Sequence, residues 1–174
     1  MAIGLYGYSS LALDSKGRIA MPAKYKEALK EVSEGSLVIT RDPQYPSLRI
    51  YPGSLWKTIS KAFENLSGLD SKIRSIQWNF LGYANLIDFE VNDRMQILIP
   101  QSLRDYAQLK VKETVSLIGM GQKFEVWNEK NWLAKEKGQQ IQGEKLDIDL
   151  PSNVQEIPFL YHVHSSASND QRNY

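Results

Sequence analysis

An internal repeat with an offset of 78 residues constrains the fold of this 174-residue chain more than any other feature. The segment LDSKGRIAMP (residues 13–22) aligns with VNDRMQILIP (residues 91–100), and Ile19 matches Ile97. Both segments end in a proline that precedes a short helical pattern. Proline suits the first turn of a helix, because its missing N–H would be unpaired there in any case. The repeat predicts two related structural units.

The rest of each copy has the same order of elements. Two strand-like runs come next, and a tryptophan then opens a helix. The turn between the runs is two residues longer in the first copy, so the offset becomes 76 and Trp56 aligns with Trp132. The pattern in each half therefore predicts the same order of elements, which is strand, loop, strand, helix, hairpin and helix. The strand-like runs are residues 36–42 and 47–52 in the first copy, and 114–120 and 123–128 in the second.

Short, half-buried strands need a partner sheet, so two such halves can bury each other's faces in one small barrel. We therefore predict an α+β, β-rich fold with helices at its periphery. The first module covers residues 1–78, and a linker helix runs from an Asp70 N-cap to about Leu81. The second module covers residues 79–140. Residues 141–174 have no sustained period, and we expect a loosely ordered C-terminal extension.

Composition excludes several classes of protein. The chain has no cysteine, which excludes disulfides and thiolate sites and fits a reducing cytoplasm. No apolar run approaches the roughly 20 residues of a membrane span, and the N-terminus does not resemble a signal peptide. The formal net charge is only +1. Residues 1–78 carry 11 basic and 7 acidic side chains, whereas the remainder carries 10 and 13, so the first half is better suited to face phosphates.

The loop from Asp14 to Arg18 is the best candidate for a binding site. The Arg18 guanidinium can form two hydrogen bonds with a guanine edge or with a phosphate. Gly17 allows a positive φ, and Asp14 can accept backbone N–H groups and fix the loop. Lys16 and Lys24 flank the loop and could contact phosphates. The alternative is an Asp14–Arg18 ion pair that merely closes a turn, with solvated lysines around it.

Taken with its surroundings, this loop resembles the MraZ family. The chain has a D-x-x-G-R loop, a helix that begins after proline, L-x-x-Y-P before a tryptophan-bearing helix, and L-G-Y-A before the second copy. The resemblance covers residues 1 to about 140. It implies two AbrB-like, swapped-hairpin halves in a pseudo-symmetric, double-psi-like small barrel. It also implies ring assembly, and binding to short direct DNA repeats upstream of the protein's own division and cell-wall operon, at the nucleoid. The family's Asp-x-x-x-Arg signature falls on Asp14 and Arg18.

The second copy departs from this signature. The equivalent positions hold Asn92 and Gln96, Met95 replaces the glycine, and Arg94 and Arg104 remain nearby. We expect Arg94 to contact DNA and the second loop to contribute less than the first. The alternative function is an AbrB-like protein-interaction or antitoxin-type module with weakened DNA binding.

Other chemistry is poorly supported by the sequence. His162 and His164 could share one face of a strand, but no third metal ligand accompanies them. Carboxylate pairs occur without a nucleophile or a phosphate-binding glycine loop. We therefore expect no enzyme activity, cofactor, metal or small-molecule substrate. The tryptophans are expected to pack in the core. The carboxylate pairs are Asp88 with Glu90 and Asp147 with Asp149, and the tryptophans are Trp56, Trp78, Trp127 and Trp132.

Overall fold

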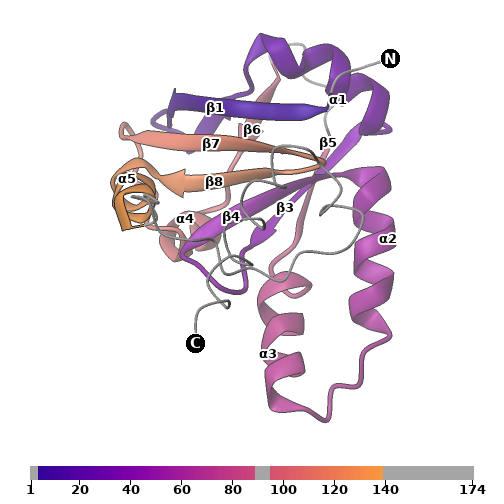
Figure 1. Ribbon diagram of the computed structural model, residues 1–174. Coiled ribbons are helices and arrows are strands. Elements are labelled where there is room, and N and C mark those ends of the chain that lie inside the picture. The colour runs from indigo at the N-terminus through magenta and orange to yellow at the C-terminus, as the bar shows by residue number, and fades with distance from the viewer. Residues whose placement is uncertain (1–3, 89–94, 139–174) are drawn as a thin grey trace, which may run out of the picture. The chain divides into compact units, whose positions relative to one another are not determined.

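The computed structural model describes residues 4–88 and 95–138 (Figure 1). The contacts discussed below lie in one compact unit that ends at Ala134. The strands are β1 (Leu5–Ala12), β2 (Arg18–Ala20), β3 (Ser36–Arg41), β4 (Ser47–Pro52), β5 (Asn85–Asp88), β6 (Gln96–Leu98), β7 (Thr114–Gly121) and β8 (Phe124–Asn128). The helices are η1 (Ala23–Tyr25), α1 (Lys26–Val32), α2 (Gly53–Glu64), α3 (Ser71–Phe80), α4 (Gln101–Tyr106) and α5 (Glu129–Gly138). Within the two described ranges, no helix has the length and apolar character needed to cross a membrane.

The strand pairing confirms an α+β, β-rich fold in which the two halves exchange hairpins. Six strands form an antiparallel sheet in the order β1-β7-β8-β4-β3-β5, and β2 pairs with β6 in a separate ribbon. The first strand of each half joins the hairpin of the other half, because β1 pairs with β7 and β5 pairs with β3. Neither half can therefore complete its sheet alone.

A pseudo-two-fold axis relates the halves. In the ribbon, Ile19 lies opposite Ile97, its own equivalent at the 78-residue offset. The relation extends beyond the ribbon. Met21 N donates to Met95 O and Ile99 N donates to Gly17 O, both at 2.9 Å, and the two bonds exchange under the same offset. In the sheet, Arg49 lies opposite Glu125, again its equivalent at the offset of 76.

The core lies between the ribbon and the sheet. Ile19 and Ile97 are fully buried there, as the alternation of inward and outward residues along each strand requires. Their neighbours come from both halves, so burial of the apolar side chains depends on the swapped arrangement. The cluster includes Leu5, Leu13, Leu29, Leu37, Ile39, Leu48, Ile50, Leu103, Leu117, Phe124 and Val126.

The predicted helix starts are confirmed. Pro22 and Pro100 are the residues before η1 and α4, with φ of −57° and −56°. Asp70 caps α3, and its Oδ1 accepts from Lys72 N at 2.7 Å and from Ile73 N at 3.3 Å. A carboxylate at this position pairs N–H groups that have no partner within the helix.

The prediction of core packing is confirmed for Trp127, which is buried, and is wrong for Trp78. Trp56 packs against Phe80 and Trp132 against Trp127. Trp78 is 62% exposed on α3, whereas Phe80 of the same helix is buried and packs against Phe63 of α2. The predicted extension 141–174, with its histidines and paired carboxylates, lies outside the described residues.

Candidate nucleic-acid interface

The loop between β1 and β2 is closed by hydrogen bonds to Asp14. Its Oδ1 accepts from Lys16 N at 2.9 Å and from Arg18 N at 2.8 Å. Its backbone N–H donates to Arg18 O at 2.9 Å, and its carbonyl accepts from Gly17 N at 3.1 Å. Gly17 has a φ of +80°, which costs glycine little. The predicted roles of Asp14 and Gly17 in shaping the loop are confirmed.

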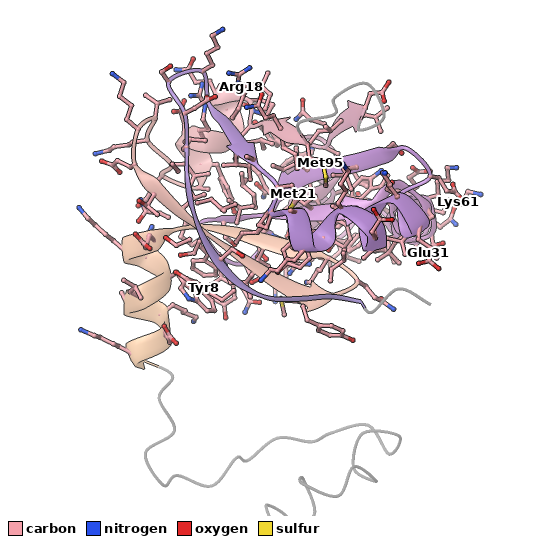
Figure 2. All side chains as sticks on the ribbon, turned by 90° about the horizontal axis from the view of Figure 1, so that it is seen from above. Tyr8, Arg18, Met21, Glu31, Lys61 and Met95 are labelled. Carbon is pink, nitrogen blue, oxygen red and sulfur yellow. The ribbon has the colours of Figure 1, made fainter. Side chains whose placement is uncertain are left out.

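The Arg18 side chain is oriented by the same carboxylate. Arg18 Nε donates to Asp14 Oδ2 at 2.8 Å, while the side chain of Arg18 remains 36% exposed. Among the described residues, its terminal Nη groups have no hydrogen-bond partner. Figure 2 shows Arg18 at the rim of the molecule, away from the buried Met21 and Met95. The ion pair exists, and it leaves the outer edge of the guanidinium available.

The charge of Asp14 is secured by these contacts. The pKa of its carboxyl lies below the ordinary value of 3.8, chiefly because the backbone N–H of Arg18 donates to it, and the Arg18 guanidinium and Lys16 N–H act in the same direction. Asp14 is therefore ionised throughout the physiological range, and the Arg18 Nε bond is charge-assisted.

The other predicted contacts are not all at this loop. Lys16 is exposed within it. Lys24 lies elsewhere: its Nζ stands 4.9 Å from the ring centroid of Tyr25, next to Gly7 on β1. Gly7 is separated from Asp14 by six residues, five of them in β1, which is about 20 Å of extended chain. Arg94 lies outside the described residues.

The connection before β6 is two residues longer than the loop before β2. Leu11 pairs with Val115, and Ile87 pairs with Leu37, the equivalent of Val115. Leu11 and Ile87 are therefore equivalent at an offset of 76, whereas the offset in the ribbon is 78. The sequence alignment did not show this difference, because the strand pairing is needed to fix the equivalence.

Met95 adopts a positive φ of +50° at the place where the first loop has Gly17. Its side chain is buried in the core. The loss of glycine has therefore not changed the handedness of the backbone at this point, and Gln96 begins β6 as Arg18 begins β2. Asn92 lies outside the described residues.

The side chain of Arg104, on α4, lies against the first loop, although the sequence suggested a position near the second loop. An ideal Cβ on Gly17 would lie 2.6 Å from Arg104 Nη1 and 2.8 Å from Arg104 Cζ. The guanidinium of α4 thus lies directly over the Cα of Gly17. No local motif could have found this contact, since it depends on the pairing of β2 with β6 from the other half.

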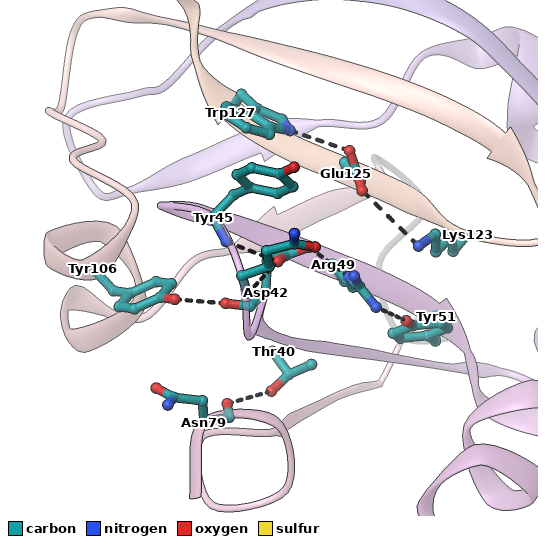
Figure 3. A network of polar contacts seen from close by, with 11 residues as sticks. Thr40, Asp42, Tyr45, Arg49, Tyr51, Asn79, Tyr106, Lys123, Glu125 and Trp127 are labelled. Carbon is teal, nitrogen blue, oxygen red and sulfur yellow. Dashed lines mark hydrogen bonds and ion pairs between the residues drawn. The ribbon is translucent and has the colours of Figure 1, made fainter. Parts of the chain in front are cut away.

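A second polar cluster lies on the sheet face opposite the core (Figure 3). The Asp42 side chain is 1% exposed, and its Oδ2 accepts from Arg49 Nε at 2.6 Å. Arg49 Nη1 donates to the Tyr51 hydroxyl at 3.2 Å, and burial raises the pKa of Tyr51. Burial lowers the pKa of Lys123, whose Nζ lies 3.9 Å from Glu125 Oε1. The charges of this cluster balance one another, which indicates a structural role.

Two half-chains that exchange hairpins about a pseudo-two-fold axis, with an Asp–Arg loop at the end of the central ribbon, define an AbrB-like swapped-hairpin protein. A family model described as "MraZ protein, putative antitoxin-like" matches residues 5–77 and 89–146. The chain belongs to the MraZ family.

Three relatives named "Transcriptional regulator MraZ" support this assignment. The protein from Shewanella oneidensis is 41% identical over 142 residues, which cover 80% of this chain and 91% of the relative. The one from Saccharophagus degradans is 34% identical over 148 residues, 83% and 98% of the two chains. The one from Shewanella amazonensis is 43% identical over 129 residues, 74% and 82%. The family is thus one of DNA-binding transcriptional regulators.

Proposed function

We propose that this protein is a sequence-specific regulator that binds double-stranded DNA through the Asp14–Arg18 loop. The observation that carries the proposal is the Arg18 guanidinium, fixed through Nε by Asp14 Oδ2 and 36% exposed. An arginine held in this way has its outer nitrogens aligned before DNA binds, so less side-chain entropy is lost on binding.

The chemistry of the loop suits a base edge and the adjoining backbone. The terminal nitrogens of Arg18 would form two hydrogen bonds with O6 and N7 of a guanine in the major groove. Lys16, exposed two residues away, would contact a phosphate and position the loop without reading sequence. Lys24, whose Nζ lies beside Gly7 of β1, stays a predicted phosphate contact away from the loop itself. Arg94 remains a predicted contact from the second loop.

We further propose that the protein acts as a ring on short direct repeats upstream of its own division and cell-wall operon, at the nucleoid. A chain with a net charge of +1 gains little from a single contact, whereas several linked copies bind with avidity. Large apolar side chains on the surface support self-association, since such patches mark interaction sites. Tyr6 and Met120 form an exposed cross-strand pair, and Trp78 and Leu86 are exposed near the other edge of the sheet.

Substitution of Arg18 tests the proposal. A bidentate arginine–guanine contact is worth about 1–3 kcal/mol, so Arg18→Ala should weaken binding to the DNA upstream of the gene by about ten-fold or more per engaged subunit. Gln96→Ala, at the equivalent position of the second half, is the control and should have a much smaller effect. Binding isotherms at one salt concentration measure both, and light scattering should report a species well above 19.9 kDa.

The opposite result would favour a different function. If the Arg18→Ala protein is folded and binds the upstream DNA like the wild type, the loop is not the primary DNA contact. The AbrB-like interaction or antitoxin-type module then becomes the better interpretation. A strict monomer at micromolar concentration, with and without DNA, would contradict the ring.

A further inference from the structure

We propose that the DNA-binding surface of the first loop is composite, and that the second half supplies two phosphate-binding cations, Arg104 and Lys112. This inference rests on the proposed function, since it assigns further contacts to the same loop. The ligand is the DNA phosphodiester backbone, which is recognised by charge and not by sequence.

Arg104 is held in place at the loop. Its guanidinium covers the Cα of Gly17, where any side chain would collide with it. Its Nε is buried and has no hydrogen-bond partner among the described residues. Burial of an unpaired Nε costs free energy. The half-buried side chain of Arg104 also makes no ion pair with a described residue, so its positive charge has no counter-charge there. A bound phosphate would supply the missing counter-charge.

Lys112 is attached to the same loop by backbone hydrogen bonds. Lys112 N donates to Leu13 O at 2.7 Å, and Leu13 N donates to Glu113 O at 3.0 Å. Lys112 has a φ of +65° and is exposed. Its Cα is therefore fixed beside the residue that precedes Asp14, on the strand side of the loop, while Arg104 lies over Gly17 at the ribbon side.

The pseudo-symmetry distinguishes the two halves at the position of Lys112. The equivalents of Arg104 and Lys112 at the offset of 78 are Lys26 and Glu34. Glu34 has the same backbone conformation as Lys112, with a φ of +50°, but it carries a carboxylate that pairs with Lys57 at 3.2 Å. At this position the second half thus places a cation where the first half places an anion, whereas Lys26 keeps the positive charge of Arg104.

The charges around the first loop favour an anion. Among the described residues, four cations and three carboxylates lie in the loop, beside it, or next to a residue that contacts it, which leaves a net charge of +1. Lys112 lies at the Leu13 end of the loop and Arg104 lies over Gly17, so a DNA strand that crosses the loop would be contacted at more than one phosphate. The cations are Lys16, Arg18, Arg104 and Lys112, and the carboxylates are Asp14, Asp105 and Glu113.

The salt dependence of binding tests this surface. The variants are Arg104→Met, which retains a side chain over Gly17, and Lys112→Gln. Lys26→Met, at the position equivalent to Arg104, is the matched control. The probes are a duplex from the region upstream of the gene and a duplex of the same length with scrambled sequence. The association constant K falls as the salt concentration rises. Each lost phosphate contact should make the slope of log K against the logarithm of the salt concentration less steep by about 0.9, and should weaken binding about five- to ten-fold at 0.1 M salt.

Arg104→Met and Lys112→Gln should weaken binding to both duplexes by similar factors, whereas Arg18→Ala should weaken the upstream duplex more. Lys26→Met should bind like the wild type. If Arg104→Met and Lys112→Gln keep the wild-type slope while Arg18→Ala loses upstream binding, the composite surface is wrong and the proposed function stands. If Arg18→Ala binds normally, the proposed function fails. Thermal melting verifies that each variant is folded. If the Arg104→Met protein is not folded, the slope measured for Lys112→Gln decides whether the surface is composite.

Discussion

Asp14 is an acidic residue at the centre of a surface proposed to bind an anion, so its effect on DNA binding separates two physical interpretations. Simple charge repulsion predicts that Asp14→Asn tightens binding. The structure predicts the opposite, because Asp14 Oδ2 orients Arg18 through Nε and Oδ1 accepts two backbone N–H groups. We expect Asp14→Asn to weaken binding by about three- to ten-fold, because one charge-assisted hydrogen bond to Arg18 Nε is lost. Isotherms measure the change, and the NMR resonance of the Arg18 Nε–H should move upfield.

The pH dependence follows from the lowered pKa of Asp14. A carboxyl group with a pKa lower in the folded state contributes stability that is fully present above its unfolded pKa. That contribution is lost as the pH falls through the folded value. The loop should therefore be unchanged between pH 5 and 8, and the Arg18 Nε–H resonance should shift only below the ordinary value of 3.8. A shift near pH 6 would contradict the assignment of Asp14 as its partner.

At the scale of elements, the two hairpins close their turns by different means. In the first, Asp42 N donates to Ser47 O, and Asp42 Oδ1 accepts from Gln44 N and Tyr45 N. The second is two residues shorter and uses Gly121, with a φ of +90°. The buried carboxylate of Asp42 therefore explains how the first hairpin accommodates its longer turn.

Asp42→Ala should destabilise the protein by about 3 kcal/mol. Removal of one partner of a buried ion pair costs about 3–5 kcal/mol, and the Arg49 side chain is still 24% exposed, which places the effect at the lower end. Asp70→Ala is the control, since the loss of an exposed N-cap costs about 1 kcal/mol. Chemical denaturation measures both. Equal losses of stability for the two substitutions would show that the buried ion pair of Asp42 with Arg49 adds no stability beyond the backbone hydrogen bonds that Asp42 accepts in the turn.

The sequence predicted those elements that depend on local patterns and on the repeat. The prolines before η1 and α4, the cap at Asp70 and the equivalence of Ile19 with Ile97 are all confirmed. Arg104 could not be assigned to its loop, because its contact with Gly17 depends on tertiary structure. The exposure of Trp78 was not predicted either, because its apolar surroundings in the sequence do not all lie on one face of α3.

At the scale of the molecule, the exchange of hairpins makes the two halves a single folding unit. Among the described residues, the first strand of each half pairs only with the other half's hairpin, and Ile19 and Ile97 bury each other. A fragment of residues 1–84 has no partner for β1 and leaves its share of the core exposed, so it should not fold as a monomer. Two copies of it would place Arg49 opposite another Arg49, and like charges opposite each other destabilise a sheet.

Residues 1–84 and 85–138 should instead combine in a 1:1 complex, because Arg49 then lies opposite Glu125, as in the intact chain. Each fragment alone should show weak far-UV circular dichroism and no cooperative melting at micromolar concentration, and an equimolar mixture should recover both signals. Light scattering gives the stoichiometry. An Ile19→Asp fragment is the control: a charge placed opposite Ile97 in the core should abolish the recovery. If residues 1–84 alone form a monomer that melts cooperatively, the halves are independent domains. The pseudo-two-fold axis would then reflect the packing of two complete units and not the exchange of their strands.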